Sequence, residues 1–166
     1  MNVGFVHLGC SKNLIDTEAI IGKFKENQYK IVNNEKDADI IVINTCGFID
    51  SAKEEAINTI LEMAEYKKKR CRYLIVIGCL VQRYYEDLIK ALPEVDLFIK
   101  IDEYDHLWEK IEDLIKRDVV KKSKTKTSTK ILEIPPMPMF EQKELLNRTI
   151  TTGENYAYLK IGEGCS

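Results

Sequence analysis

Three cysteines, Cys10, Cys46 and Cys79, are the side chains of this sequence with the clearest chemical potential. Each follows an apolar run typical of a buried strand, and each precedes a helical pattern. Parallel α/β sheets bind ligands at the carboxyl ends of their strands. We therefore expect these three thiols to converge on one metal centre. The runs are Val3–Leu8, Asp39–Thr45 and Arg72–Gly78, and the helical patterns begin near Ser11, Asp50 and Leu80.

The surroundings of these thiols favour metal binding. Unpaired N–H groups at a helix N-terminus stabilise anions, and the thiolate is the form that binds metals. Gly9, Gly47 and Gly78 neighbour the cysteines, and glycine lets the backbone approach a bulky centre closely. The alternative is three buried cysteines that pack as small apolar side chains. Core cysteines have no reason to occur only at strand ends, so we favour the metal centre.

The donor set favours an iron–sulfur cluster. A tetrahedral zinc site usually takes four protein ligands, and neither histidine completes one. His7 lies within a predicted strand and His106 opens a predicted helix, where a lone histidine is more often packed or solvated than ligating. Three thiolates and one open position suit an iron–sulfur cluster with an accessible iron. Zinc remains the main alternative metal, because thiolates bind it well.

The other two cysteines differ from these three. Cys71 stands between Arg70 and Arg72 at the amino end of a strand, on the opposite side from the site, and we interpret it as a bystander thiol. Its arginine neighbours are expected to lower its pKa and permit incidental oxidation. Cys165 follows an apparent strand and a Gly-Glu-Gly turn, which places it at a further strand end. No CxxC, phosphate-loop, HExxH or GxSxG motif occurs.

Strands and helices alternate along the chain, which predicts a doubly wound α/β fold with a parallel five-stranded, flavodoxin-like sheet in the order 2-1-3-4-5. In that order the three strands that carry the cysteines are neighbours. The expected strands are Asn2–Leu8, Tyr29–Val32, Asp39–Thr45, Tyr73–Ile77 and Val95–Ile99, and the expected helices are Ser11–Asn27, Asp50–Lys69, Val81–Leu92 and Tyr104–Arg117.

The chain divides into a first domain at residues 1–117, a linker at 118–150 and the start of a second domain at 151–166. Lys121–Lys130 has no apolar residue, so we interpret it as a solvated linker. It also lacks the aromatic side chains that usually stack on nucleic-acid bases, which argues against an RNA contact. Tyr156–Ile161 is predicted to be the first strand of the second domain.

Composition excludes several classes of protein. The net charge of −2 provides no overall attraction to nucleic acid. No run of about 18 apolar residues could cross a membrane, and no signal peptide is visible. We therefore expect a cytoplasmic protein, in which five cysteines indicate metal binding or catalysis and not disulfides.

Four motifs, in order, resemble those of the radical S-adenosylmethionine methylthiotransferases. The motifs are His7–Leu14 (HLGCSKNL) with Asp16–Glu18, Asn44–Ile49 (NTCGFI) with Ala52–Glu55, Gly78–Tyr84 (GCLVQRY), and Tyr156–Ile161 (YAYLKI) through Gly164 and Cys165. The last of these is similar to the approach to a CxxxCxxC motif. The family often has serine where this chain has His7, a departure that affects nothing catalytic.

The resemblance implies two 4Fe–4S clusters and S-adenosylmethionine as cofactors. Cys10, Cys46 and Cys79 would bind an auxiliary cluster, and Cys165 would be the first of three ligands of the radical cluster, next to the first strand of a truncated radical barrel. Ser11–Asn13 and Gly47–Ile49 are similar to the branch that methylthiolates an aspartate of ribosomal protein S-twelve at its β-carbon. Because the later barrel motifs are absent, we expect a fragment without turnover of its own.

Two alternatives remain open. One is a stand-alone iron–sulfur or sulfur-carrier module. The other is the same chemistry on adenosines of transfer RNA, whose family branch more usually shows Gly-Cys-Gln-Met-Asn at the first motif. The sequence identifies no catalytic side chain, and no electron or sulfur donor.

Overall fold

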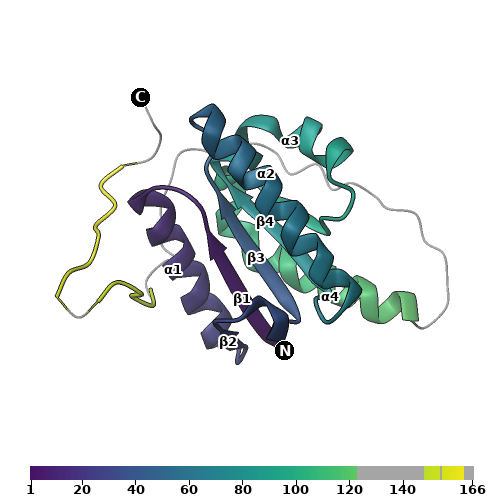
Figure 1. Ribbon diagram of the computed structural model, residues 1–166. Helices are drawn as coiled ribbons and strands as arrows, with labels where there is room; N and C mark the ends of the chain where they lie inside the picture. Colours follow the sequence, from purple (N-terminus) through teal and green to yellow (C-terminus); the bar gives the residue numbers. More distant parts are fainter. Residues whose placement is uncertain (123–147, 154, 163–166) are drawn as a thin grey trace.

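The computed structural model describes residues 1–122, 148–153 and 155–162. Five parallel strands form one sheet in the order β2-β1-β3-β4-β5, which confirms the predicted α/β fold and strand order (Figure 1). The strands are β1 (Asn2–His7), β2 (Lys30–Val32), β3 (Ile40–Thr45), β4 (Tyr73–Gly78) and β5 (Leu97–Ile99), and the helices are α1 (Ser11–Glu26), α2 (Asp50–Ala64), α3 (Cys79–Ala91) and α4 (Leu107–Lys122).

The central strands are apolar because helices cover both faces of the sheet. Every residue of β3 and β4 is buried, as expected for strands in the middle of a doubly wound sheet. Ile41 and Ile43 pack in a core with α2 and α3, whereas Ile40 and Val42 pack in a second core with α1 and α4. Alternate residues of one strand thus supply the two cores, and each fully buried isoleucine stabilises the fold by about 1.5–3 kcal/mol.

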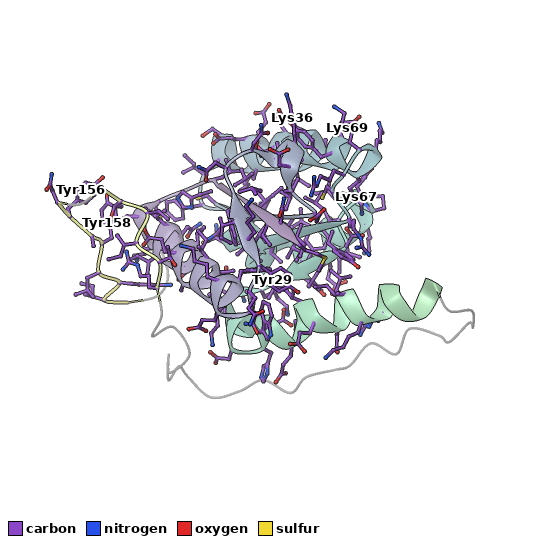
Figure 2. The ribbon with its side chains drawn as sticks, turned by 90° about the horizontal axis from the view of Figure 1, so that it is seen from below. Tyr29, Lys36, Lys67, Lys69, Tyr156 and Tyr158 are labelled. Atoms are coloured by element: carbon purple, nitrogen blue, oxygen red, sulfur yellow. The ribbon has the colours of Figure 1, made fainter. Side chains whose placement is uncertain are left out.

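An aromatic cluster joins α1 to α4 across one face of the sheet. The ring of Phe24 meets the rings of Tyr29 and Trp108 edge to face, with centroids 5.3 Å and 5.4 Å away. Tyr29 also packs against Trp108 at 5.7 Å and lies where the two helices meet (Figure 2). These contacts fix α1, the helix that follows Cys10, against the rest of the domain.

Some element boundaries differ from the predicted ones. The second helix ends at Ala64 and continues as a 3-10 turn over Glu65–Lys68. The third begins at Cys79 itself. The fourth follows a 3-10 segment at Ile101–His106 and continues through residues 118–122, which the sequence assigns to the linker. No described helix has the length and apolar character needed to cross a membrane.

The predicted strand at Tyr156–Ile161 is wrong, because residues 155–162 form no strand. A strand requires a partner for its backbone N–H and C=O groups, and no other described segment pairs with this one. It runs instead beside α1, where Figure 1 shows it in yellow. Most of the predicted linker, and Cys165, lie outside the described residues.

Candidate metal centre

Parallel pairing brings the ends of β1, β3 and β4 to one edge of the sheet. His7 pairs with Asn44, and Thr45 pairs with Gly78, so the three strands end nearly level. The thiols differ in local setting. Cys10 is the N-cap residue of α1, and Cys79 is the first residue of α3. Cys46 follows β3 directly but precedes a short loop, because α2 begins only at Asp50.

Two of the three thiols meet at one side chain. The Sγ atoms of Cys10 and Cys79 lie 3.9 Å and 3.7 Å from Oδ1 of Asn13, which can accept a hydrogen bond from each. Asn13 is buried, and its Nδ2 donates to the carbonyl oxygen of Thr45 at 3.1 Å. A residue of the first helix turn therefore links the thiols that end β1 and begin α3.

Two glycines with positive φ permit the tight turns at these strand ends. Gly9 has φ of +138°, and a Cβ there would lie only 3.2 Å from Cβ of Cys46. Gly78 has φ of +103°, and a Cβ there would collide with Oδ1 of Asn44 and the carbonyl of Thr45. The backbone of Gly9 thus lies against Cβ of Cys46, which brings this residue next to the turn that carries Cys10.

A cavity of about 170 Å³ opens at this edge of the sheet. Cys10, Cys79 and Asn13 line it, and Cys46 does not. The other lining residues include three cations, one carboxylate and one aromatic side chain: Lys12, Arg83, Lys160, Asp16 and Phe48. The Arg83 guanidinium donates to the carbonyl of Gly47 at 3.3 Å. The cavity is therefore a site of mixed thiol and cationic character, suited to an anionic or electron-rich group.

A single metal ion does not fit this arrangement well. Among residues 1–122, 148–153 and 155–162, no three Cys, His, Asp or Glu side chains lie close enough to hold one ion. An iron–sulfur cluster differs from a single ion because each thiolate binds a different iron atom, so its ligands stand further apart. The thiol donor set and the two close-approach glycines are compatible with a cluster.

A profile of the family described as "Uncharacterized protein family UPF0004" matches residues 2–100. The chain belongs to this family. The match covers all five strands of the sheet and all three cysteines of the candidate centre.

Three curated relatives of this UPF0004 domain protein carry the same name. Proteins named "Ribosomal protein uS12 methylthiotransferase RimO" from Alkaliphilus oremlandii, Caldicellulosiruptor saccharolyticus and Geobacter sulfurreducens are 58%, 47% and 44% identical. These alignments cover 99%, 100% and 99% of this chain, but 34%, 36% and 34% of the relatives. The chain thus spans about a third of the length of the curated relatives it matches, and corresponds to their N-terminal part.

The two histidines of the chain, His7 and His106, lie outside the cavity. His7 is half-buried, with Nδ1 3.4 Å from the hydroxyl of Thr17. Burial lowers the pKa of His7, although a backbone hydrogen bond at Gly9 and the charge of Glu18 partly oppose this. His106 lies 3.2 Å from the carboxylate of Glu109, next to α4. Neither histidine lines the cavity that holds Cys10 and Cys79.

Cys71 lies at the amino end of β4, away from the candidate centre, as expected. It is only 4% exposed, and its thiol contacts the carbonyl of Tyr73 at 3.3 Å. The expected lowering of its pKa by the neighbouring arginines is wrong. Burial raises the pKa of Cys71 to about 11, because the apolar surroundings disfavour the thiolate. The expected incidental oxidation therefore has no support in this structure.

Sequence reasoning missed the role of two carboxylates of α1, Asp16 and Glu18. Both are buried, and both pair with residues of the segment 148–162. Burial raises the pKa of Glu18, but hydrogen bonds from Thr151 and Arg148 outweigh it, so the pKa lies below its ordinary value. The available signal was the position of both acids between the apolar residues Leu14, Ile15 and Ala19–Ile21 of the same helix, because a buried acid requires a partner.

Proposed function

We propose that this chain is the N-terminal part of a radical S-adenosylmethionine methylthiotransferase that modifies an aspartate of ribosomal protein uS12. The observation that carries the proposal is the 58% identity, over 99% of the chain, to a relative named as a uS12 methylthiotransferase. The thiols at adjacent strand ends support it independently. A ribosomal protein substrate would place the enzyme in the cytoplasm.

In this proposal Cys10, Cys46 and Cys79 hold the auxiliary 4Fe–4S cluster. When bound, such a cluster would supply one iron with an open position for a sulfur ligand. The protein would hold the thiolates in place through Asn13, the N-terminus of α1 at Cys10 and the N-terminus of α3 at Cys79. Gly9 and Gly78 would keep the backbone turns tight enough for all three thiols to face one centre.

Cys165 is proposed as the first ligand of the radical 4Fe–4S cluster, where S-adenosylmethionine would bind. It lies outside the described residues, and the proposal for it rests on the sequence motif alone. The activity itself is proposed for a protein of the relatives' full length, of which this chain spans about a third.

The residues around the opening of the cavity favour a protein as the substrate. Phe48 and Ile49 are 48% and 54% exposed, in the loop that follows Cys46. Exposed apolar side chains beside a concave site suit contact with another protein. Lys12 also lines the cavity and offers a cation to a carboxylate such as that of aspartate.

Mass spectrometry of two substrates tests the function. A bacterial strain that lacks the full-length gene is compared with the same strain after the gene is restored. Restoration should return the methylthio mass increment to an aspartate of uS12 and leave transfer-RNA adenosines unchanged. An increment on transfer RNA alone would assign the chain to the transfer-RNA branch, and an increment on neither would reject the proposal.

A further inference from the structure

The segment 148–162 contacts α1 through two buried carboxylates. The side chain of Glu18 is 0% exposed and that of Asp16 is 5% exposed. Acidic side chains are almost never buried to this degree unless they are paired. Here both partners come from a part of the chain more than 100 residues later in the sequence.

Glu18 receives three hydrogen bonds from one short stretch of chain. Arg148 donates from Nε to Oε2 at 2.6 Å, and its Nη2 makes an ion-pair contact with the same oxygen at 2.5 Å. Thr151 donates its backbone N–H to Oε1 at 2.5 Å and its hydroxyl to the same oxygen at 2.7 Å. The N–H of Thr149 also donates to the backbone carbonyl of Glu18 at 3.1 Å. Both carboxylate oxygens are therefore satisfied by this segment.

Asp16 pairs with Lys160, and this second pair reaches the thiol cavity. Lys160 Nζ lies 2.6 Å from Oδ1 of Asp16, and the two side chains are 6% and 5% exposed. Both residues line the cavity together with Cys10 and Cys79. The later segment therefore forms part of the wall of a site whose cysteines all belong to the first domain.

The segment makes these contacts with its polar groups, while its apolar side chains face outward. Tyr156 and Tyr158 are 60% and 41% exposed and pack against each other at 5.8 Å, on the outer side of the segment (Figure 2). Leu159 is 83% exposed. Burial of apolar surface therefore contributes little to this contact, and the ion pairs carry it.

We propose that Asp16 and Glu18 are an intramolecular docking site for the segment 148–162, and that this docking builds the Lys160 wall of the thiol cavity. Its chemical consequence rests on the proposed function. Cys165 follows Lys160 by five residues, and five residues of fully extended chain reach only about 18 Å. Docking at Lys160 thus limits how far the two proposed cluster sites can separate, which makes Asp16 and Glu18 positioning residues.

Hydrogen–deuterium exchange of the 166-residue chain tests the docking. Arg148→Met lies in the docked segment and leaves every residue of the sheet and its helices unchanged. The amides of Thr149 and Thr151 should exchange slowly in the wild type. Arg148→Met should accelerate them by at least about tenfold, because a charge-assisted hydrogen bond is worth more than the free energy of a tenfold change. Glu18→Ala should have the same effect from the α1 side.

Alkylation of the thiols gives a second readout. Loss of the Lys160 wall should raise the alkylation rate of Cys79 in Arg148→Met, which keeps the charges of both Lys160 and Asp16, measured by mass spectrometry of the metal-free protein. Lys116→Met is the matched control, because it removes a lysine from an exposed ion pair with Glu112 on α4. It should leave both the exchange and the alkylation rates unchanged.

The salt dependence of amide exchange distinguishes docking through buried ion pairs from a loose surface contact. Screening weakens exposed ion pairs much more than buried ones, so protection of Thr151 should persist at 1 M salt. Equal exchange at Thr149 and Thr151 in the wild type and Arg148→Met would overturn the docking. Neither readout involves iron, so that result would leave the proposed cluster untouched. Conversely, normal docking in a protein that binds no iron would reject the proposed function alone.

Discussion

Asn13 donates a hydrogen bond from Nδ2 to the carbonyl oxygen of Thr45, at 3.1 Å. This contact fixes the orientation of the amide and turns Oδ1 toward the thiols of Cys10 and Cys79. A neutral acceptor at that point holds both thiols without adding negative charge to a site that is proposed to hold thiolates.

Asn13→Asp should therefore slow the alkylation of Cys10 and Cys79. A carboxylate about 4 Å from a thiolate opposes it by about 1 kcal/mol or more, which corresponds to a roughly fivefold lower rate. Iodoacetamide labelling at pH 7, followed by mass spectrometry, measures this. Asn27→Asp, which adds the same charge at the exposed C-cap of α1, is the control. Equal rates in Asn13→Asp and the wild type would argue against the orienting role of Asn13.

Alanine substitutions of the three cysteines should each remove the bound iron. After anaerobic reconstitution with iron and sulfide, the wild type should hold about four iron atoms per chain, and Cys10→Ala, Cys46→Ala or Cys79→Ala fewer than about one. Cys71→Ala, a buried thiol away from the site, is the matched control and should keep its iron. Full iron content in Cys46→Ala would remove that residue from the ligand set.

The metal should be iron with sulfide, even though zinc also binds thiolates. Anaerobically prepared protein should contain iron and acid-labile sulfide in roughly equal amounts, as a cluster requires. Elemental analysis and a sulfide assay on the same sample measure both. One zinc per chain without sulfide under these conditions would indicate a structural zinc site instead.

The buried thiol of Cys71 should destabilise the fold at high pH. Its pKa is about 11 in the folded protein and 9.0 in its ordinary state, so folding favours the protonated form. The contribution of this protonated thiol to the free energy of unfolding is complete below pH 9. It is lost as the pH rises through 11, and the total loss is about 2–3 kcal/mol. Urea unfolding should show that the free energy of unfolding falls less between pH 8 and pH 10.5 in Cys71→Ala than in the wild type. An equal fall in both proteins would contradict the raised pKa of Cys71.

Acid should release the docked segment 148–162. The pKa of Glu18 lies below its ordinary value of 4.5 in the folded protein, so its pairing stabilises the docked state above that value. As the pH falls below 4.5 and through the lowered pKa, the carboxyl gains a proton and this stabilisation is lost. The backbone amide resonance of Thr151 in NMR spectra should report this change. In Glu18→Ala the same resonance should show no such titration.

The fold could be predicted from the sequence because its signals are local. Buried Ile and Val runs in β3 and β4, separated by amphipathic helices, define a parallel sheet, and the strand order follows from the usual topology of such sheets. The strand at Tyr156–Ile161 could not be judged in this way, because a strand depends on partners that local sequence does not specify. Its apolar residues are exposed in the structure instead.

The candidate site was only partly accessible to sequence reasoning. The topology places Cys10 and Cys79 at one edge of the sheet, and the structure brings both to Asn13. The ligand set, including Cys46 and Cys165, stays a prediction. Asp16 and Glu18 were missed because their partners lie more than 100 residues away, and a periodic pattern within one helix carries no information about such contacts.

The two outer strands, β2 and β5, are only three residues long each. An outer strand exposes unpaired N–H and C=O groups that can recruit a strand from another molecule, and a short one offers few of them. The long, apolar strands β3 and β4 lie inside the sheet, where no second chain can reach them. The folded protein should therefore resist edge-to-edge aggregation, and the risk is concentrated in the unfolded chain, where the Ile-rich strands are exposed during synthesis or refolding.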